Sequence, residues 1–269
     1  MTATSPSPLR IAALYVYPLK GAAGLPVPTA DVTPRGLSGD RRWMVAGADG
    51  RFLSGRTHPA FVLLRARPVP GGLRLEADGH PPLDVETPGE TAPRVSGEVW
   101  GSRLALREAP AARAWLRAWL GADARLVYQP DETRRPADPA YAPGHEVSLA
   151  DAYPLLVTTE PSRHDLEARA GVALDVRRFR PNVVVEGGAP WGEDGWGDLA
   201  LGPVAFRAVK PCARCSVTTL DPDTAEASAE PLRTLAGFRK RGSKVLFGQY
   251  LVPLAGGALR VGDALSLGA

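Results

Sequence analysis

Both cysteines of this 269-residue chain, Cys212 and Cys215, lie within one short segment, residues 210–224 (Lys-Pro-Cys-Ala-Arg-Cys-Ser-Val-Thr-Thr-Leu-Asp-Pro-Asp-Thr). Any thiolate chemistry of the protein must arise here. A thiolate is a soft metal ligand, and the pKa of a thiol generally falls when cations lie nearby. Lys210 and Arg214 supply two such cations. The segment is therefore the first candidate for a metal-binding or reactive site.

A Cys-x-x-Cys pair admits several chemistries, and the flanking residues decide between them. A thioredoxin-like redox pair lies at a helix N-terminus, whereas Ser-Val-Thr-Thr at 216–219 predicts a strand and residues 221–223 predict a turn. A structural zinc site needs four ligands, and the histidines lack the spacing that would complete one. Burial of both cysteines as small core residues stays open, although Lys-Pro before the pair is unusual in a core strand.

With its flanks, this segment resembles the signature of MOSC-domain proteins of the amidoxime-reducing component and YcbX type. The shared residues are Cys-Ala-Arg-Cys at 212–215, Thr-Thr at 218–219 and Asp-Pro-Asp-Thr at 221–224. Four further blocks match in the family's order, at residues 14–20, 36–45, 178–185 and 246–250. The resemblance implies that the chain binds the molybdenum cofactor (Mo-molybdopterin), with Cys215 as the catalytic metal ligand.

The resemblance also implies which residues hold the cofactor. Cations at strand ends of the first half are expected to close over it, and polar residues before the apolar run 183–185 to contact its pterin and phosphate. The expected contacts are Lys20, Arg41, Arg180, Asn182, Ala213 and Arg214. Two positions depart from the family's pattern. Gly21 stands where a small hydroxyl residue is common, and Ala225 stands where the turn usually continues with glycine, which tolerates positive φ better than alanine.

A helix start beside the cleft offers another anion site. Residues 158–162 (Thr-Thr-Glu-Pro-Ser) predict the beginning of a helix that contains Leu166 and ends by Gly171. Thr159 or Ser162 is expected to cap this helix. Free N–H groups at a helix N-terminus favour a phosphate, and molybdopterin carries one. Thr159 and Ser162 are therefore also expected cofactor contacts.

The remaining pattern predicts a mainly β fold of the β-barrel type with a few flanking helices. Strands are expected at residues 10–17, 42–46, 61–67, 73–77 and 103–107, and a helix at 112–120 that ends at Gly121. The resemblance implies an N-terminal MOSC β-barrel domain at 8–125 and a MOSC domain at 130–267. The Pro- and Asp-rich residues 129–146 are expected to connect the two domains or to form a loop over the cleft.

Composition is compatible with two modest domains that share a cleft, since 44% of the residues are hydrophobic. The net charge is only +3, and the arginines are scattered among acids, so we expect no nucleic-acid partner. The sequence has no apolar run of about 18 residues and no signal-peptide pattern at its start, so we expect no membrane partner and a cytoplasmic location.

The expected function follows from the resemblance: reduction of small N-hydroxylated substrates. The chain shows no strand-GxGxxG-helix unit for a flavin and has too few cysteines for an iron–sulfur cluster. Electrons are therefore expected from separate donor proteins, a flavin reductase and an iron–sulfur or haem carrier. Two alternatives stay open. The chain could be a cofactor carrier or sulfur-handling module without turnover, or a degenerate barrel that binds no metal.

Overall fold

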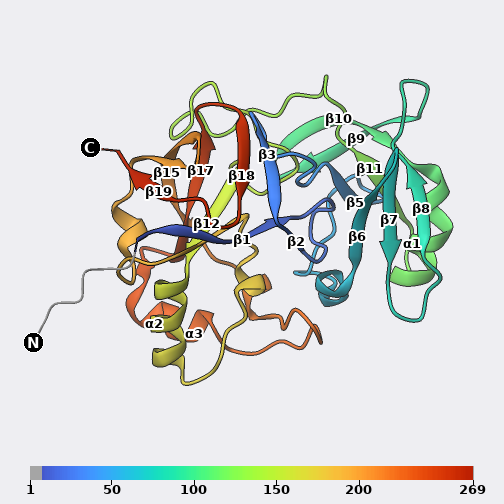
Figure 1. Cartoon of the computed structure of the whole chain (residues 1–269). Coiled ribbons are helices and arrows are strands. Elements are labelled where there is room, and N and C mark those ends of the chain that lie inside the picture. The colour runs from blue at the N-terminus through green and yellow to red at the C-terminus, as the bar shows by residue number, and fades with distance from the viewer. Residues whose placement is uncertain (1–7, 269) are drawn as a thin grey trace, which may run out of the picture.

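Strands dominate the computed structural model, which describes residues 8–268 and shows two lobes side by side (Figure 1). The prediction of a mainly β fold with few helices is confirmed. The strands of the first lobe are β1 (Arg10–Val16), β2 (Leu25–Val27), β3 (Thr29–Thr33), β4 (Gly36–Leu37), β12 (Leu155–Thr159), β13 (Val183–Glu186), β14 (Asp198–Leu201), β15 (Val204–Ala213), β16 (Lys240–Arg241), β17 (Lys244–Pro253), β18 (Gly257–Arg260) and β19 (Leu265–Leu267).

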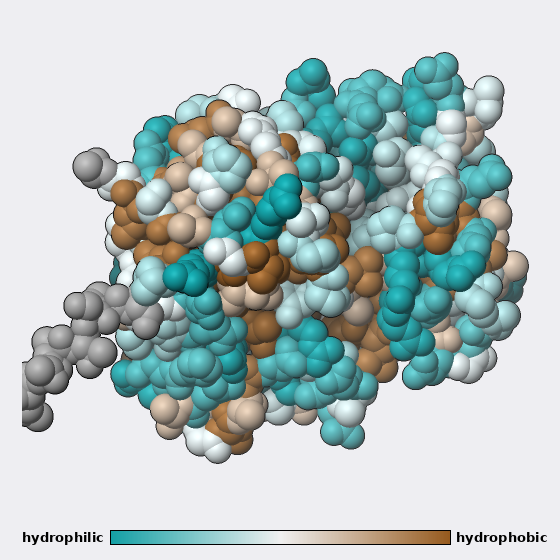
Figure 2. Space-filling view, viewed as in Figure 1, coloured by the Kyte–Doolittle hydropathy of each residue, from teal (hydrophilic) through white to brown (hydrophobic). Residues whose placement is uncertain are grey.

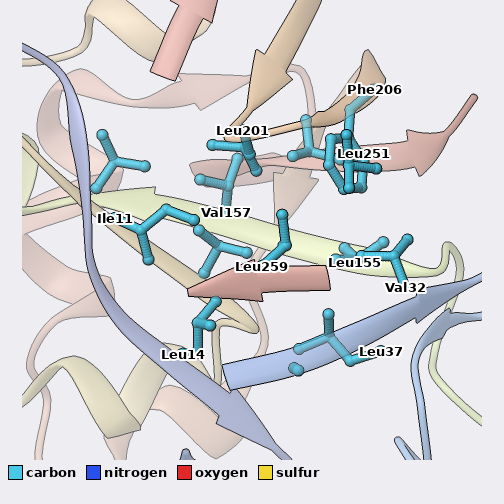
Figure 3. Close-up of a cluster of buried hydrophobic side chains, with 14 of the residues drawn as sticks. Ile11, Leu14, Val32, Leu37, Leu155, Val157, Leu201, Phe206, Leu251 and Leu259 are labelled. Carbon is cyan, nitrogen blue, oxygen red and sulfur yellow. The ribbon is translucent and has the colours of Figure 1, made fainter. Parts of the chain in front are cut away.

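The first lobe is built around a nine-stranded sheet with the order β19-β14-β15-β17-β12-β13-β1-β2, in which β16 also pairs with β17. Strands β12 and β13 run parallel, and the other neighbours in the sheet run antiparallel. A second sheet, β18-β3-β4, packs on it. Apolar side chains from both sheets meet in one buried core, which includes Leu14, Val32, Val157, Phe206 and Leu259 (Figure 3). This core holds the strands that carry the cysteine segment.

The first strands of the chain belong to this lobe, although they come from the N-terminal stretch 8–125. Strand β1 pairs antiparallel with β13, and β3 pairs antiparallel with β18. The β strands of the expected domain 130–267 therefore share their sheets with residues 10–37. The chain then leaves for the second lobe after the turn that carries Arg41, which has a left-handed φ of 46°.

The second lobe contains two smaller sheets, β5-β11-β10-β9 and β6-β7-β8, and one helix. Trp115 and Leu116 of that helix are buried among the apolar residues of the lobe, and the helix lies where the sequence predicts one, at 112–120. The elements are β5 (Trp43–Gly47), β6 (Arg65–Val69), β7 (Gly72–Glu76), β8 (Leu83–Glu86), β9 (Arg94–Val99), β10 (Ser102–Glu108), β11 (Ala124–Tyr128) and α1 (Arg113–Leu120).

Helices are few, and their ends follow ordinary capping rules. Helices α1 and α2 (Glu160–Ala170) stop at Gly121 and Gly171, which take left-handed φ values of 69° and 68°, as expected for glycine after a helix. The other helices are α3 (Leu232–Phe238) and the 3-10 turns Pro59–Leu63, Pro110–Ala112, Val176–Phe179, Gly192–Gly195 and Ser216–Thr219. No helix within residues 8–268 is long and apolar enough to cross a membrane.

Two of the predicted strands are wrong in whole or in part. Residues 216–219 form a 3-10 turn, because the hydroxyls of Thr218 and Thr219 donate to the carbonyls of Cys215 and Ser216, three residues back, at 2.9 and 2.7 Å. The predicted strand 61–67 begins as the 3-10 turn Pro59–Leu63, and only β6 from Arg65 onward is extended. In both places the β-branched or apolar composition wrongly indicated a strand, because local hydrogen bonds outweigh a weak strand propensity.

Polarity is distributed unevenly over the face seen in Figure 2. Hydrophilic residues cover most of the second lobe and the region of α2 and α3, whereas apolar residues show where the two lobes meet. Apolar residues also show over the strands β15, β17 and β19 of the first lobe, so the junction is one of two weakly polar regions on this face.

The turn after the cysteine segment gives a test of backbone strain. Asp221 accepts hydrogen bonds from the backbone N–H groups of Asp223 and Thr224 at 2.9 and 3.1 Å, and Ala225 follows with φ of 60°. A left-handed alanine costs about 1 kcal/mol relative to glycine. We expect Ala225→Gly to raise the free energy of unfolding by about 1 kcal/mol, as measured by denaturant titration. A loss of stability would show that the turn does not carry this strain.

Candidate active site

A pocket at the junction of the lobes brings together most of the residues that the sequence singled out. Its walls come from the first 60 residues and from the segments 150–156, 178–182, 212–218 and Tyr250. Of the expected site residues, those that line it are Lys20, Arg41, Arg180, Asn182, Ala213, Arg214 and Cys215. The strand pairing of β1 with β13 explains why the N-terminal and C-terminal residues meet.

Cys215 is the thiol that this pocket exposes. It is partly exposed, follows β15 and precedes the 3-10 turn Ser216–Thr219, whereas Cys212 is buried at 3% exposure within β15. The Arg56 guanidinium lies 3.5 Å from Cys215 Sγ and 3.4 Å from a carboxylate oxygen of Asp151. A cation at this distance stabilises a thiolate. Cys215 is accordingly placed to act as a ligand toward the pocket.

Cys212 has a different environment. Arg214 donates to Cys212 Sγ at 2.8 Å and to the carbonyl of Phe179 at 2.6 Å, so its guanidinium joins β15 to the 178–180 segment. Burial and the neighbouring Cys212 raise the pKa of Tyr250 well above its ordinary value, which keeps that phenol protonated. The two cysteines thus differ in accessibility, because Cys212 is buried in the pocket wall and Cys215 is partly exposed to the pocket.

Cations far outnumber acids around the pocket. Among the lining residues that the structure describes, Asp151 is the one acid, whereas the cations are Lys20, Arg41, Arg56, Arg178, Arg180 and Arg214. Arg180 and Arg214 have no carboxylate partner within residues 8–268. Buried guanidinium groups without counter-ions are costly unless a ligand supplies the charge. The pocket therefore favours an anion.

The Lys20 ammonium and the Asp151 carboxylate form an ion pair at one side of the pocket. Lys20 also donates to the carbonyl of Leu149 at 2.9 Å. Burial lowers the pKa of Lys20 to about 8, although Asp151 acts in the opposite direction. Burial by itself would raise the pKa of Asp151, but Lys20, Trp100 and Arg56 hold it well below its usual range. At neutral pH the pair is therefore charged.

Arg41 and Arg180 approach the same buried ring. Their guanidinium carbons lie 4.2 and 4.5 Å from the centroid of Tyr17, whose hydroxyl donates to the carbonyl of Pro181 at 3.1 Å. Arg41 also bonds the Asp40 carboxylate at 2.6 Å. Burial lowers the pKa of Arg180 to about 10, which leaves it charged at neutral pH. Arg180 is the less restrained of the two cations, so it has more freedom to bind a ligand.

Asn182 lines the pocket, but its side-chain amide is already used. Its amide nitrogen donates to Asp40 at 3.0 Å and to the carbonyl of Tyr15 at 3.2 Å. Its oxygen accepts from Arg41 at 3.1 Å and from the backbone of Leu156 at 3.2 Å. With both donors and both acceptor positions engaged, the expected direct contact to the cofactor has no free group. The structure instead gives Asn182 the role of holding Arg41 and Asp40 in place.

Thr159 and Ser162 do not line this pocket. Thr159 does cap helix α2, as predicted, since its hydroxyl accepts from the backbone N–H of Ser162 at 3.3 Å. However, both hydroxyls also donate to the buried carboxylate of Glu193, at 3.1 and 2.7 Å. Burial raises the pKa of Glu193. The helix start expected to hold a phosphate is thus occupied by a side chain of the protein itself.

Several pocket residues were absent from the sequence interpretation. Arg56, Asp151 and Arg178 line it. Arg178 donates to Asp221 at 2.7 Å, and so links the Asp-Pro-Asp-Thr turn to the 178–185 block. The signal for Arg178 was present, since both partners belong to matched blocks. Nothing in the sequence identified Arg56 or Asp151, because each comes from a segment without a distinctive motif.

The chemistry of the pocket fits the expected cofactor. Each of Arg178, Arg180 and Arg214 has a buried side-chain nitrogen that finds no hydrogen-bond partner in the described part of the chain. Buried donors are normally satisfied, so unpaired nitrogens on three arginines that line one pocket favour a polar ligand there. A phosphate and a hydrogen-bonding pterin would satisfy them. Cys215 supplies the single soft ligand that a molybdenum atom carried by a dithiolene needs from the protein.

Family models and named relatives match most of the chain. Residues 8–123 match the MOSC N-terminal beta barrel domain, and residues 144–266 match the MOSC domain. The chain is 34% identical to mitochondrial amidoxime-reducing component 1 of Homo sapiens, over 96% of this chain and 82% of that protein. It is 32% identical to mitochondrial amidoxime reducing component 2 of Bos taurus, over 94% and 81%. The solved YUAD protein from Bacillus subtilis aligns with a TM-score of 0.45 at 12% identity, over 97% of this chain and 96% of its own.

The two family matches show that the chain has an N-terminal MOSC barrel and a MOSC domain. The cationic pocket with its accessible thiol lies where the two lobes meet. The chain belongs to the family of the mitochondrial amidoxime-reducing components.

The ionisation of Lys20 gives a pH test of the pocket. Its pKa of about 8 means that the ammonium is charged below pH 8 and neutral above it. We expect the affinity of the pocket for sulfate, which does not titrate in this range, to fall as pH rises from 7 to 9, by roughly threefold to tenfold. Calorimetric titration at constant ionic strength measures this. In Lys20→Met the affinity should be lower and nearly independent of pH, and an unchanged pH profile in that variant would exclude Lys20.

Proposed function

We propose that the protein is a molybdenum-cofactor-dependent reductase of small N-hydroxylated compounds. The observation that carries the proposal is the pocket in which Cys215 is the exposed thiol among cations whose buried nitrogens lack partners. The names of the relatives, amidoxime-reducing components, point to the substrate class. Reduction of an amidoxime breaks its N–O bond, takes up two electrons and two protons, and releases water and an amidine.

Different residues of the pocket would hold different parts of the cofactor. Cys215 would ligate the metal, and Arg178, Arg180 and Arg214 would bind the phosphate and pterin. Lys20 would add charge from the segment between β1 and β2. The bound cofactor supplies the two-electron chemistry. Arg56 lies between Asp151 and Cys215, at 3.4 Å from an Asp151 oxygen and 3.5 Å from Cys215 Sγ, and would place a positive charge beside the ligating sulfur. Asn182 and Asp40 keep Arg41 oriented toward the pocket.

Electrons are proposed to come from separate proteins. The sequence holds two cysteines, too few for an iron–sulfur cluster bound by four thiolates. It also lacks a flavin-binding glycine motif. A flavin reductase with a small iron–sulfur or haem carrier would complete the chain of electron transfer. The competing function is a cofactor carrier or sulfur-handling module, which would use the same residues without turnover.

The two cysteines should respond differently to substitution. We expect Cys215→Ala to abolish activity and to change the absorption spectrum of the bound molybdenum, because the metal loses its protein ligand. Cys212→Ala should lower the free energy of unfolding by about 1 kcal/mol through lost packing, with the spectrum retained. Molybdenum content, absorption spectra and denaturant titration of both variants test this. Full activity in both variants would remove Cys215 from the site.

Turnover with a chemical reductant separates the enzyme from the carrier. We expect cofactor-loaded protein to oxidise reduced viologen in the presence of benzamidoxime and to be inactive with NADH or NADPH alone. Addition of a flavin reductase and an iron–sulfur or haem carrier should restore NADH-driven turnover. Loaded protein that leaves reduced viologen untouched with every substrate of an N-hydroxylated panel would favour the carrier, and direct NADPH-driven turnover would reveal a flavin site in the chain.

A further inference from the structure

A second hollow adjoins the Cys215 pocket. This cleft has a volume of about 910 Å³, and its walls come from the β9–β10 hairpin, residues 135–141, β15 and the β16–β17 hairpin. The two hollows share Asp151, Tyr153, Ala213 and Tyr250. Ala213 lies two residues before Cys215. A molecule bound in the cleft would therefore lie against the same wall that carries Cys215.

Trp100, in the wall of this cleft, sits in an unfavourable backbone position. Val99 pairs with Ser102, so Trp100 and Gly101 form a two-residue hairpin turn, with φ of 51° and 82°. Such turns prefer Asn-Gly or Asp-Gly, because both central residues need positive φ. A bulky residue with positive φ is a genuine outlier, and strain of this kind concentrates at functional sites. The side chain is also 55% exposed, so burial does not account for it.

Contacts of Trp100 fix its ring beside the reacting groups. Its Nε1 donates to Asp151 at 3.1 Å, and the Arg56 guanidinium lies 4.5 Å from its ring centroid. The same Arg56 lies 3.5 Å from Cys215 Sγ. A second exposed aromatic ring, Tyr141, lines the same cleft. The cleft therefore offers flat apolar surfaces within reach of the thiol.

The cleft also carries cations without carboxylate partners. Lys210, Arg241 and Lys244 line it, and none of them forms an ion pair within residues 8–268. Lys210 lies 3.8 Å from the ring centroid of Tyr141.

Other charged groups of the cleft are committed to the protein. Arg135 donates to the carbonyls of Ser148, Ala150 and Asp151. Asp151 is paired with Lys20 and Arg56. Asp138 accepts a hydrogen bond from the backbone of Ala140 but forms no ion pair within residues 8–268, so it sets one negative charge against the three unpaired cations of the cleft. Aromatic rings and unpaired cations are thus the recognition groups that remain.

We propose that this cleft is the substrate-binding site and that it selects planar aromatic N-hydroxylated compounds carrying an anionic group. The ring packs on Trp100, and the anionic group binds Lys210 and the β16–β17 cations. The assignment of the N-hydroxyl end rests on the proposed reductase function. A concave cleft beside the pocket fits a small molecule, whereas the convex face of a donor protein could touch the cations without filling it.

Binding measured without any reductant tests the cleft independently of turnover. The probes are benzamidoxime and 4-carboxybenzamidoxime, titrated calorimetrically into cofactor-loaded protein. We expect the carboxylated compound to bind about tenfold more tightly, and this preference to shrink as ionic strength rises. If the preference is found but reduced viologen is not oxidised, the cleft stands and the reductase proposal fails. Equal affinity for the two compounds at low salt would overturn the charge selection.

Variants assign the binding to residues. Lys210→Met combined with Lys244→Met should erase the preference, whereas Lys240→Met, a lysine of the same hairpin outside the cleft, should retain it. Trp100→Asn suits the turn and should weaken both compounds by roughly tenfold in a folded protein, and Trp100→Phe should restore most of the affinity. The double substitution of Lys210 and Lys244 could instead leave the affinity for both compounds unchanged and slow turnover only when a donor protein, not viologen, supplies the electrons. In that case the cleft is a docking surface for the donor protein and the proposal is wrong.

Discussion

The hydrogen bonds that converge on Asp40 and Asn182 fix the turn at which the chain leaves the first lobe, beside the pocket. Asp40 accepts from the backbone of Tyr17 and from Asn182, and it pairs with Arg41. Both Asp40 and Asn182 are almost fully buried. Groups that are buried and bonded in this way have one favourable arrangement, since any shift would leave a charge or amide unsatisfied. Because Arg41 follows directly, the chain enters the second lobe at a fixed angle.

Around this junction the protein concentrates positive charge that it does not neutralise. Arg180 and Arg214 lack acidic partners in the described chain, and burial lowers the pKa of both Lys20 and Arg180. Such an arrangement destabilises the empty fold and favours an anionic occupant. The strained turn at Trp100 likewise costs stability at the neighbouring cleft. Local stability has been given up where a ligand is expected to bind.

The residues that line the pocket were easier to predict from the sequence than the residues that hold them in place. The cysteine segment and the blocks around Lys20, Arg41 and Arg180 identified residues that do meet in one pocket. Thr159 and Ser162 were misplaced because the carboxylate that binds them belongs to Glu193, and no local pattern links it to that helix.

The prediction of secondary structure after Cys215 was wrong for a comparable reason. The residues after Cys215 look like a strand by composition, but their hydroxyls close a 3-10 turn. Asp151 and Arg56 carry no motif, and only the packing of the lobes reveals them. Trp100-Gly101 between two strands was a readable signal, since that position of a hairpin is normally occupied by asparagine.

The pairing of β1 with β13 and of β3 with β18 bears on how the protein is made. During synthesis β1 cannot pair with β13 until residue 186 has left the ribosome, and β3 cannot pair with β18 until residue 260 has. Sheets that depend on such distant contacts form slowly and expose unpaired edges meanwhile. The second lobe, whose strands all lie between Trp43 and Tyr128, can assemble first. The pocket would then be the last part to close, which leaves a period during biosynthesis when a bulky cofactor could enter from the open side.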